Sequence, residues 1–103
     1  MATATVNTAD YANPYLSQID KSTPQRLAET LTAAADAARR DASTKAKAAD
    51  QLRTNAQSMA SVGGATAAQV NGMLARAAEY EADATALLQV ASAFDASAAR
   101  IPT

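Results

Sequence analysis

The chain of 103 residues contains no cysteine, no histidine and no tryptophan. Without cysteine it forms no disulfide and has no thiolate nucleophile, and without histidine it lacks the commonest general base and the commonest zinc ligand. Glycine and proline occur three times each, and only four residues are aromatic. From these absences we expect neither an enzyme nor a site for a cofactor or a metal ion.

The chain also lacks an excess of either charge, since nine basic and ten acidic residues leave a net charge of −1. This balance argues against nucleic acid as a partner. No run of 18 or more apolar residues is present, so we expect no transmembrane segment. The first eight residues lack the basic and apolar regions of a secretory signal. Two locations stay open: the cytoplasm, or export by a specialised system with an uncleaved polar leader.

Alanine is what the chain has in abundance, at 30 positions, whereas leucine, isoleucine, valine and phenylalanine together occupy only 14. Alanine is the best helix former but buries little surface when it packs. The composition therefore predicts an all-α protein with a thin core.

Helix start and stop signals divide the chain into an arm, residues 1–23, and a helical hairpin, residues 24–103. Thr23-Pro24 has the residue types preferred at an N-cap and a first helical position. No glycine or proline follows until Gly63-Gly64, which suits a left-handed helix end. These signals predict a helix over 24–62 and a turn over 63–65.

The second long helix is expected over 66–101. Thr66 and Gln69 have the spacing of a capping box, and Pro102 ends the pattern. Two long helices joined by so short a turn must lie antiparallel, as an αα-hairpin resembling a coiled coil.

The apolar pattern defines the seam between these helices. On the second helix every third and then fourth residue from Val70 alternates between a large side chain and alanine, which allows close approach of the two backbones. In an antiparallel hairpin that folds about Gly64, the numbers of facing residues sum to about 128. This register sets Lys45 and Lys47 opposite Glu79, Glu81 and Asp83. The large residues of the predicted seam are Leu27, Leu31, Leu52, Met59, Val70, Met73, Tyr80, Leu87, Phe94 and Ile101.

In the arm, Asn13-Pro14 predicts the start of a short helix. Tyr11, Tyr15 and Ile19 recur every four residues and share one face. Two interpretations stay open: these side chains clamp the arm against its own hairpin, or they pack on a neighbouring subunit.

An alanine-rich seam cannot offset the ordering cost of the chain, and without cysteine or histidine the remaining source of stability is association. We therefore expect a homo-oligomer or filament, a non-enzymatic structural subunit that assembles with itself. The alternative is a helical interaction module, such as an adaptor, a chaperone or a secreted heterodimer partner. The predicted interface residues are Tyr11, Tyr15, Leu16 and Ile19 in the arm, with Leu74 and Leu88 beside the seam.

In architecture the chain is similar to needle-type secretion subunits, which are short helical hairpins, although Gly63-Gly64 stands where they carry a proline-containing turn. In length and alanine content it also resembles the Trp-x-Gly hairpins of type VII secretion. It lacks their tryptophan, however, and Tyr80-Glu81-Ala82-Asp83 is one residue shorter than their Tyr-x-x-x-Asp motif. Neither similarity covers a complete motif, so the sequence is assigned to no family.

Overall fold

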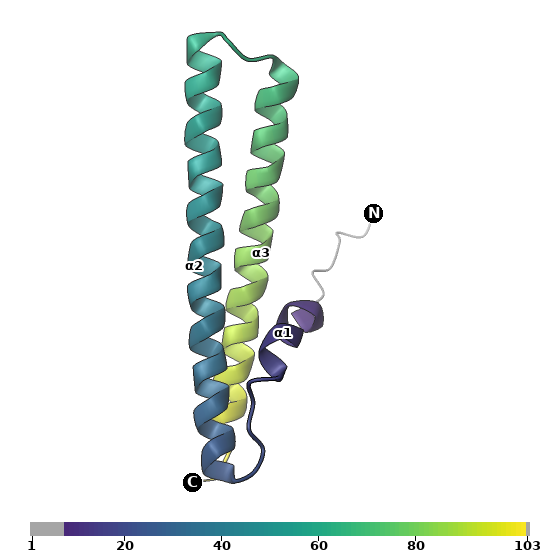
Figure 1. Ribbon diagram of the computed structural model, residues 1–103, viewed down its shortest axis with the longest axis vertical. Coiled ribbons are helices and arrows are strands. Elements are labelled where there is room, and N and C mark those ends of the chain that lie inside the picture. The colour runs from purple at the N-terminus through teal and green to yellow at the C-terminus, as the bar shows by residue number, and fades with distance from the viewer. Residues whose placement is uncertain (1–7, 103) are drawn as a thin grey trace.

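The computed structural model describes residues 8–102, which form three helices and no strand: α1 over Thr8–Leu16, α2 over Pro24–Val62 and α3 over Ala67–Ala99. Helices α2 and α3 run antiparallel along a long axis of 60 Å, and α1 lies against the half of the hairpin far from the turn (Figure 1). The predicted all-α fold and helical hairpin are confirmed. We call the two ends of the hairpin the turn end, at Gly63, and the open end, where α2 begins.

The ends of α2 are set by local hydrogen bonds. The Thr23 backbone is extended, and its hydroxyl accepts a hydrogen bond from the backbone N–H of Arg26. At the other end Gly63 has a φ of 75°, and its N–H donates to the carbonyl of Met59. Because residues with a side chain rarely adopt this left-handed conformation, glycine at this position ends the helix.

A complete capping box starts α3, with Thr66 and Gln69 each bonding to the backbone N–H of the other. The helix ends at Ala99 rather than at Ile101, two residues earlier than the sequence predicted. The proline ring of Pro102 disfavours the helical conformation for Ile101, the residue before it, so the chain leaves the helix first.

Helix α1 begins at Thr8, so the prediction that Asn13-Pro14 starts a helix is wrong. Proline inside a helix removes the hydrogen bond to the carbonyl four residues earlier, but here the helix ends two residues after Pro14. The earlier start places Tyr11 and Tyr15 on the same face of one helix, and both rings pack on the hairpin. We attribute the earlier start to this packing.

Alanine forms most of the contact between α2 and α3. The alanines that are almost completely buried along the seam are Ala34, Ala38, Ala42, Ala49 and Ala56 in α2, with Ala77 and Ala91 in α3. The heptad spacing of α2 drifts near its centre, and there Lys45 occupies the seam position. Its ammonium group lies 4.9 Å from the centre of the Tyr80 ring, so a cation–π contact fills the place of an apolar side chain.

Three ion pairs cross the seam and fix its register: Arg39 with Asp95 at 2.6 Å, Lys45 with Asp83 at 3.6 Å, and Arg53 with Glu81 at 2.5 Å. Lys45 therefore faces Asp83 as the sequence predicted, whereas Glu81 pairs with Arg53 rather than with a lysine. The residues of each pair are partly exposed, so each pair contributes only about 0.2–1 kcal/mol.

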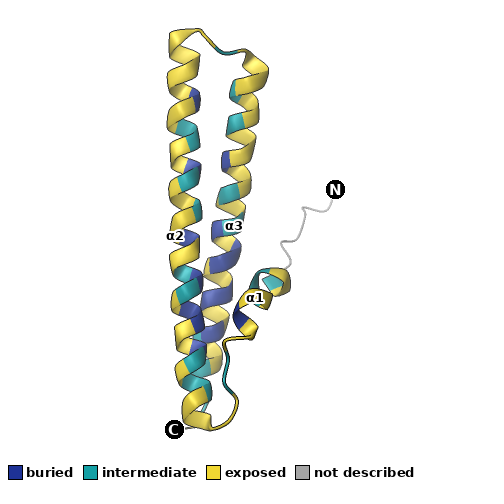
Figure 2. Ribbon diagram, in the orientation of Figure 1, coloured by how far each residue is buried: buried dark blue, intermediate teal, exposed yellow. Residues whose placement is uncertain are grey.

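The core is concentrated near the open end. Its large members are Tyr15, Leu31, Leu87, Val90 and Phe94, and α1 covers one side of them. Figure 2 shows the buried stretches of α2 and α3 gathered in the half where α1 lies. Toward the turn end, by contrast, only alanines are fully buried. Among the described residues, no helix is both long and apolar enough to span a membrane.

Candidate interaction surfaces

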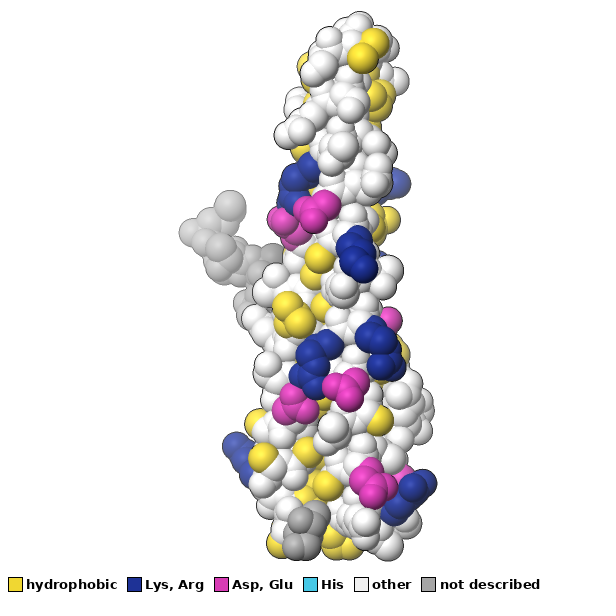
Figure 3. Space-filling view, turned by 90° about the vertical axis from the view of Figure 1, so that its left-hand side faces the viewer, with side chains coloured by type: hydrophobic (Ala, Val, Ile, Leu, Met, Phe, Trp, Pro, Cys, Tyr) yellow, Lys and Arg dark blue, Asp and Glu magenta, His cyan; other side chains and the backbone are white. Residues whose placement is uncertain are grey.

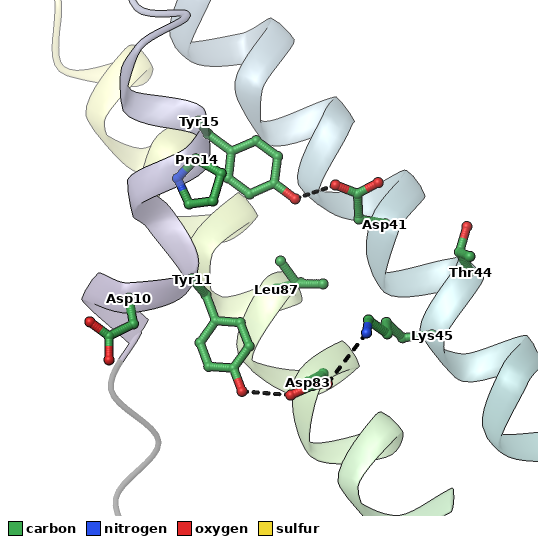
Figure 4. Close-up of a pocket in the computed structure, with 9 residues that line it drawn as sticks. All are labelled: Asp10, Tyr11, Pro14, Tyr15, Asp41, Thr44, Lys45, Asp83 and Leu87. Carbon is green, nitrogen blue, oxygen red and sulfur yellow. Dashed lines mark hydrogen bonds and ion pairs between the residues drawn. The ribbon is translucent and has the colours of Figure 1, made fainter.

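Two tyrosines attach α1 to the hairpin (Figure 4). The Tyr15 ring is 6% exposed and meets Phe94 edge to face, with 6.4 Å between the ring centres. Its hydroxyl donates a hydrogen bond to the carboxylate of Asp41 on α2. One turn earlier, the Tyr11 hydroxyl donates to Asp83 on α3 at 2.6 Å. Helix α1 is therefore bonded to both helices of the hairpin.

The surroundings of the two phenols keep them protonated. Burial, together with the hydrogen bond to Asp41 and the charge of that carboxylate, raises the pKa of Tyr15 to about 12. The hydrogen bond to Asp83 is the main cause that raises the pKa of Tyr11. Both groups are neutral near pH 7 and donate hydrogen bonds to the two carboxylates.

Beside these bonds lies a cavity of about 340 Å³, which we call the arm cavity. Three of its polar side chains have partners within the chain, because Asp41 and Asp83 accept hydrogen bonds from the two phenols and Lys45 pairs with Asp83. Within residues 8–102, no three acidic side chains converge as metal ligands. The cavity therefore lies at the contact between α1 and the hairpin. Its lining residues are Asp10, Tyr11, Pro14, Tyr15, Asp41, Thr44, Lys45, Asp83 and Leu87.

The predicted interface residues fall into two groups. Tyr15 is buried in the core, and Tyr11 and Ile19 are half-buried against it, so these three side chains contact the protein's own hairpin. Leu16, Leu74 and Leu88 are exposed, with 50%, 41% and 50% of their surface accessible. An interface at these three leucines stays a prediction.

The sequence interpretation missed a surface at the turn end. No residue between Arg53 and Arg76 carries a charge, and we call this segment, residues 54–75, the uncharged tip. Figure 3 shows charged side chains over the lower part of the molecule and none at its upper end. Large apolar side chains are exposed here, above all Val62 at 83%. The signal was present in the sequence as an interval without lysine, arginine, aspartate or glutamate.

A second cavity of about 370 Å³ opens between α2 and α3 at this end, and we call it the distal groove. Its lining residues are Leu52, Met59, Gln69, Gly72, Met73 and Arg76. Leu52 and Met59 follow Lys45 at intervals of seven residues, and Arg76 precedes Asp83 by seven. Since residues seven apart share a helix face, the distal groove continues the face on which α1 lies.

The chain was compared with protein-family models, with curated proteins and with solved structures, and none of them matched.

Proposed function

We propose that the protein is a non-enzymatic structural subunit that assembles with itself through the faces of its helical hairpin. One observation carries this proposal: exposed large apolar side chains lie on two sides of a hairpin whose core is thin. On one side is the distal groove, with Met59 at its edge; on the other are Leu74 and Leu88.

The positions of residues around the axis of α3 place the distal groove and Leu88 on different sides of the hairpin. Val90 is almost completely buried and lines a cavity together with residues of α1. Leu88 precedes Val90 by two residues, which corresponds to 200° around a helix, so it points away from α1. One self-complementary contact closes into a dimer, whereas two different contacts on opposite sides continue into a filament or a larger particle.

Energetics at the turn end also favour association. Fully burying a leucine, valine or methionine contributes about 1.5–3 kcal/mol, and alanine contributes less. Toward the turn end only Ala49, Ala56 and Ala77 are fully buried, whereas Leu52 and Met73 are half-buried and Met59 is exposed. Contact with another molecule would bury the larger side chains that the hairpin leaves accessible.

The second candidate function is a helical interaction module that binds a different helical protein. The openness of the distal groove favours it, because a groove between two helices with Arg76 as its only charged lining residue also fits an apolar helix of another chain. A stable monomer that gains helicity on adding such a partner would favour this function over self-assembly.

Size-exclusion chromatography with light scattering, followed by negative-stain microscopy, tests self-assembly. We expect a mass well above 10.5 kDa at micromolar concentration and fibres or particles in concentrated samples. Replacing Leu88 by glutamate should shorten or abolish the assemblies. The same replacement at exposed Ala82, which lies on another side of α3 and outside the uncharged tip, is the matched control. A monodisperse monomer at every concentration tested would refute the proposal.

A further inference from the structure

The face of the hairpin that carries α1 has a step in it. Helix α1 thickens only the half near the open end, as Figure 1 shows, and the distal groove continues the same face toward the turn. Because packed helices lie about 8–10 Å apart, the turn half is recessed by roughly the thickness of one helix.

From this shape we propose that two copies of the chain bind face to face and antiparallel, so that α1 of each copy fills the distal groove of the other. This inference rests on the proposed self-association and names the surface used. The contact is isologous, because the same ridge and the same recess occur on both copies. Each α1 would then lie between its own hairpin and that of its partner.

The outer face of α1 suits the groove chemically. Ala9, Asn13 and Leu16 share this face and are exposed. Asn13 lies two residues, or about 200° around the helix, from both tyrosines that pack on the hairpin, whereas Ala9 and Leu16 lie toward the flank of α1 on which Ala9 lines a cavity with α3. None of the three is charged, and Arg76 at the margin is the only charged residue that lines the groove, so no charge has to be desolvated at the centre of the contact. Leu16 is large enough to enter the groove beside Met59 and Met73.

In the antiparallel orientation, but not in a parallel one, a negative charge at the end of α1 meets a positive charge at the edge of the partner's distal groove. The N-terminal end of α1, with Asp10, points toward the turn end of its own hairpin (Figure 1). In an antiparallel partner this end therefore faces the side of the groove nearer the open end, where Arg76 lies. Among the described residues, neither Asp10 nor Arg76 forms an ion pair within the chain.

Gly72 gives the groove its depth. A Cβ atom placed on Gly72 would meet nothing within 4 Å, so the groove is open at that residue and the fold itself does not require glycine there. Glycine in a helix also costs about 1 kcal/mol relative to alanine. A side chain longer than a methyl group at this position would occupy the space into which the partner's α1 is proposed to bind.

Light scattering of a Gly72→Gln variant tests the contact. Glutamine is a better helix former than glycine, so the hairpin should stay folded, while its side chain fills the groove. We expect the association to weaken at least about tenfold. Gly72→Ala is the matched control, because its methyl group adds little volume. Association that is unchanged in Gly72→Gln would overturn the inference.

Charge reversal tests the orientation. Asp10→Lys or Arg76→Glu alone should weaken the association by about tenfold, and the double variant should restore it, because only the antiparallel arrangement joins these two residues. If the double variant is as weak as the single variants together, the orientation is wrong.

Cysteine cross-linking gives a direct measurement, since the chain contains no cysteine of its own. Leu16→Cys protein mixed with Met59→Cys protein should form a mixed disulfide on oxidation, whereas Leu88→Cys in place of Leu16→Cys should not. A wild-type monomer would refute both this inference and the proposed function. A wild-type oligomer without the Leu16–Met59 cross-link would refute only the inference.

Discussion

Tyr15 offers the most direct test of how α1 is held. Its ring is 6% exposed, packs edge to face on Phe94 and donates a hydrogen bond to Asp41. Removing a large aromatic side chain from a core costs about 3–5 kcal/mol. Because we expect α1 to detach in this variant while the hairpin stays paired, we place Tyr15→Ala near the lower limit, with a loss of about 3 kcal/mol. Tyr15→Phe, which removes only the hydrogen bond, should lose about 1 kcal/mol.

Urea unfolding followed by circular dichroism measures the free energy of unfolding of these variants. Hydrogen exchange then shows whether the amides of α1 lose protection while those of α2 keep it. The matched control is Gln18→Ala, which changes a nearby exposed residue and should cost less than about 1 kcal/mol. If Tyr15→Ala is no more destabilising than Gln18→Ala, then Tyr15 does not anchor α1.

Three further predictions concern the seam, the groove and the phenol. Ala84→Leu should lower the free energy of unfolding by about 1–3 kcal/mol, because the seam has no space for a larger side chain, whereas the same change at exposed Ala82 should have little effect; equal stability of the two variants in urea would exclude tight packing at the seam. Gly72→Ala should raise the free energy of unfolding by about 0.5–1 kcal/mol, since the added methyl group has open space, and a loss of stability would contradict that geometry. The pKa of Tyr15 is raised from 10.0 to about 12 in the folded protein, so its contribution is complete below about pH 10 and is lost as the pH rises from 10 to 12. In urea titrations over pH 9–12, the free energy of unfolding should therefore fall by about 2–3 kcal/mol more for the wild type than for Tyr15→Phe. Parallel dependence of the two free energies on pH would refute this linkage.

The hairpin could be predicted from the sequence because its signals are local. Thr23-Pro24, Gly63 and the Thr66–Gln69 capping box each act within one helical turn, and the structure shows the corresponding hydrogen bonds. The seam repeats every seven residues along α3 and, apart from a drift near its centre, along α2, and this period indicates which faces of the two helices meet.

The start of α1 could not be predicted because a distant contact decides it. Asn13-Pro14 has the local features of a helix start, yet the helix begins at Thr8, where both tyrosine rings can reach the hairpin. The partners Asp41 and Asp83 lie far away in the sequence, and no local pattern identifies them. The distal groove depends similarly on two helices together, although the interval without charge that borders it was visible in the sequence.

The uneven core has a consequence for the order in which the chain folds. A helical hairpin with uniform packing can close from its turn, where the sequence separation between contacting residues is smallest and loop closure costs least. Here the residues nearest the turn bury little, and the best-packed contacts join Leu31 and Tyr15 to Phe94 and Leu87, near the opposite ends of the chain. For this reason, we do not expect the turn to act as the nucleus on its own. We therefore expect the rate-limiting step to bring the two ends of the chain together, and refolding to be slower than the simple topology of the hairpin suggests.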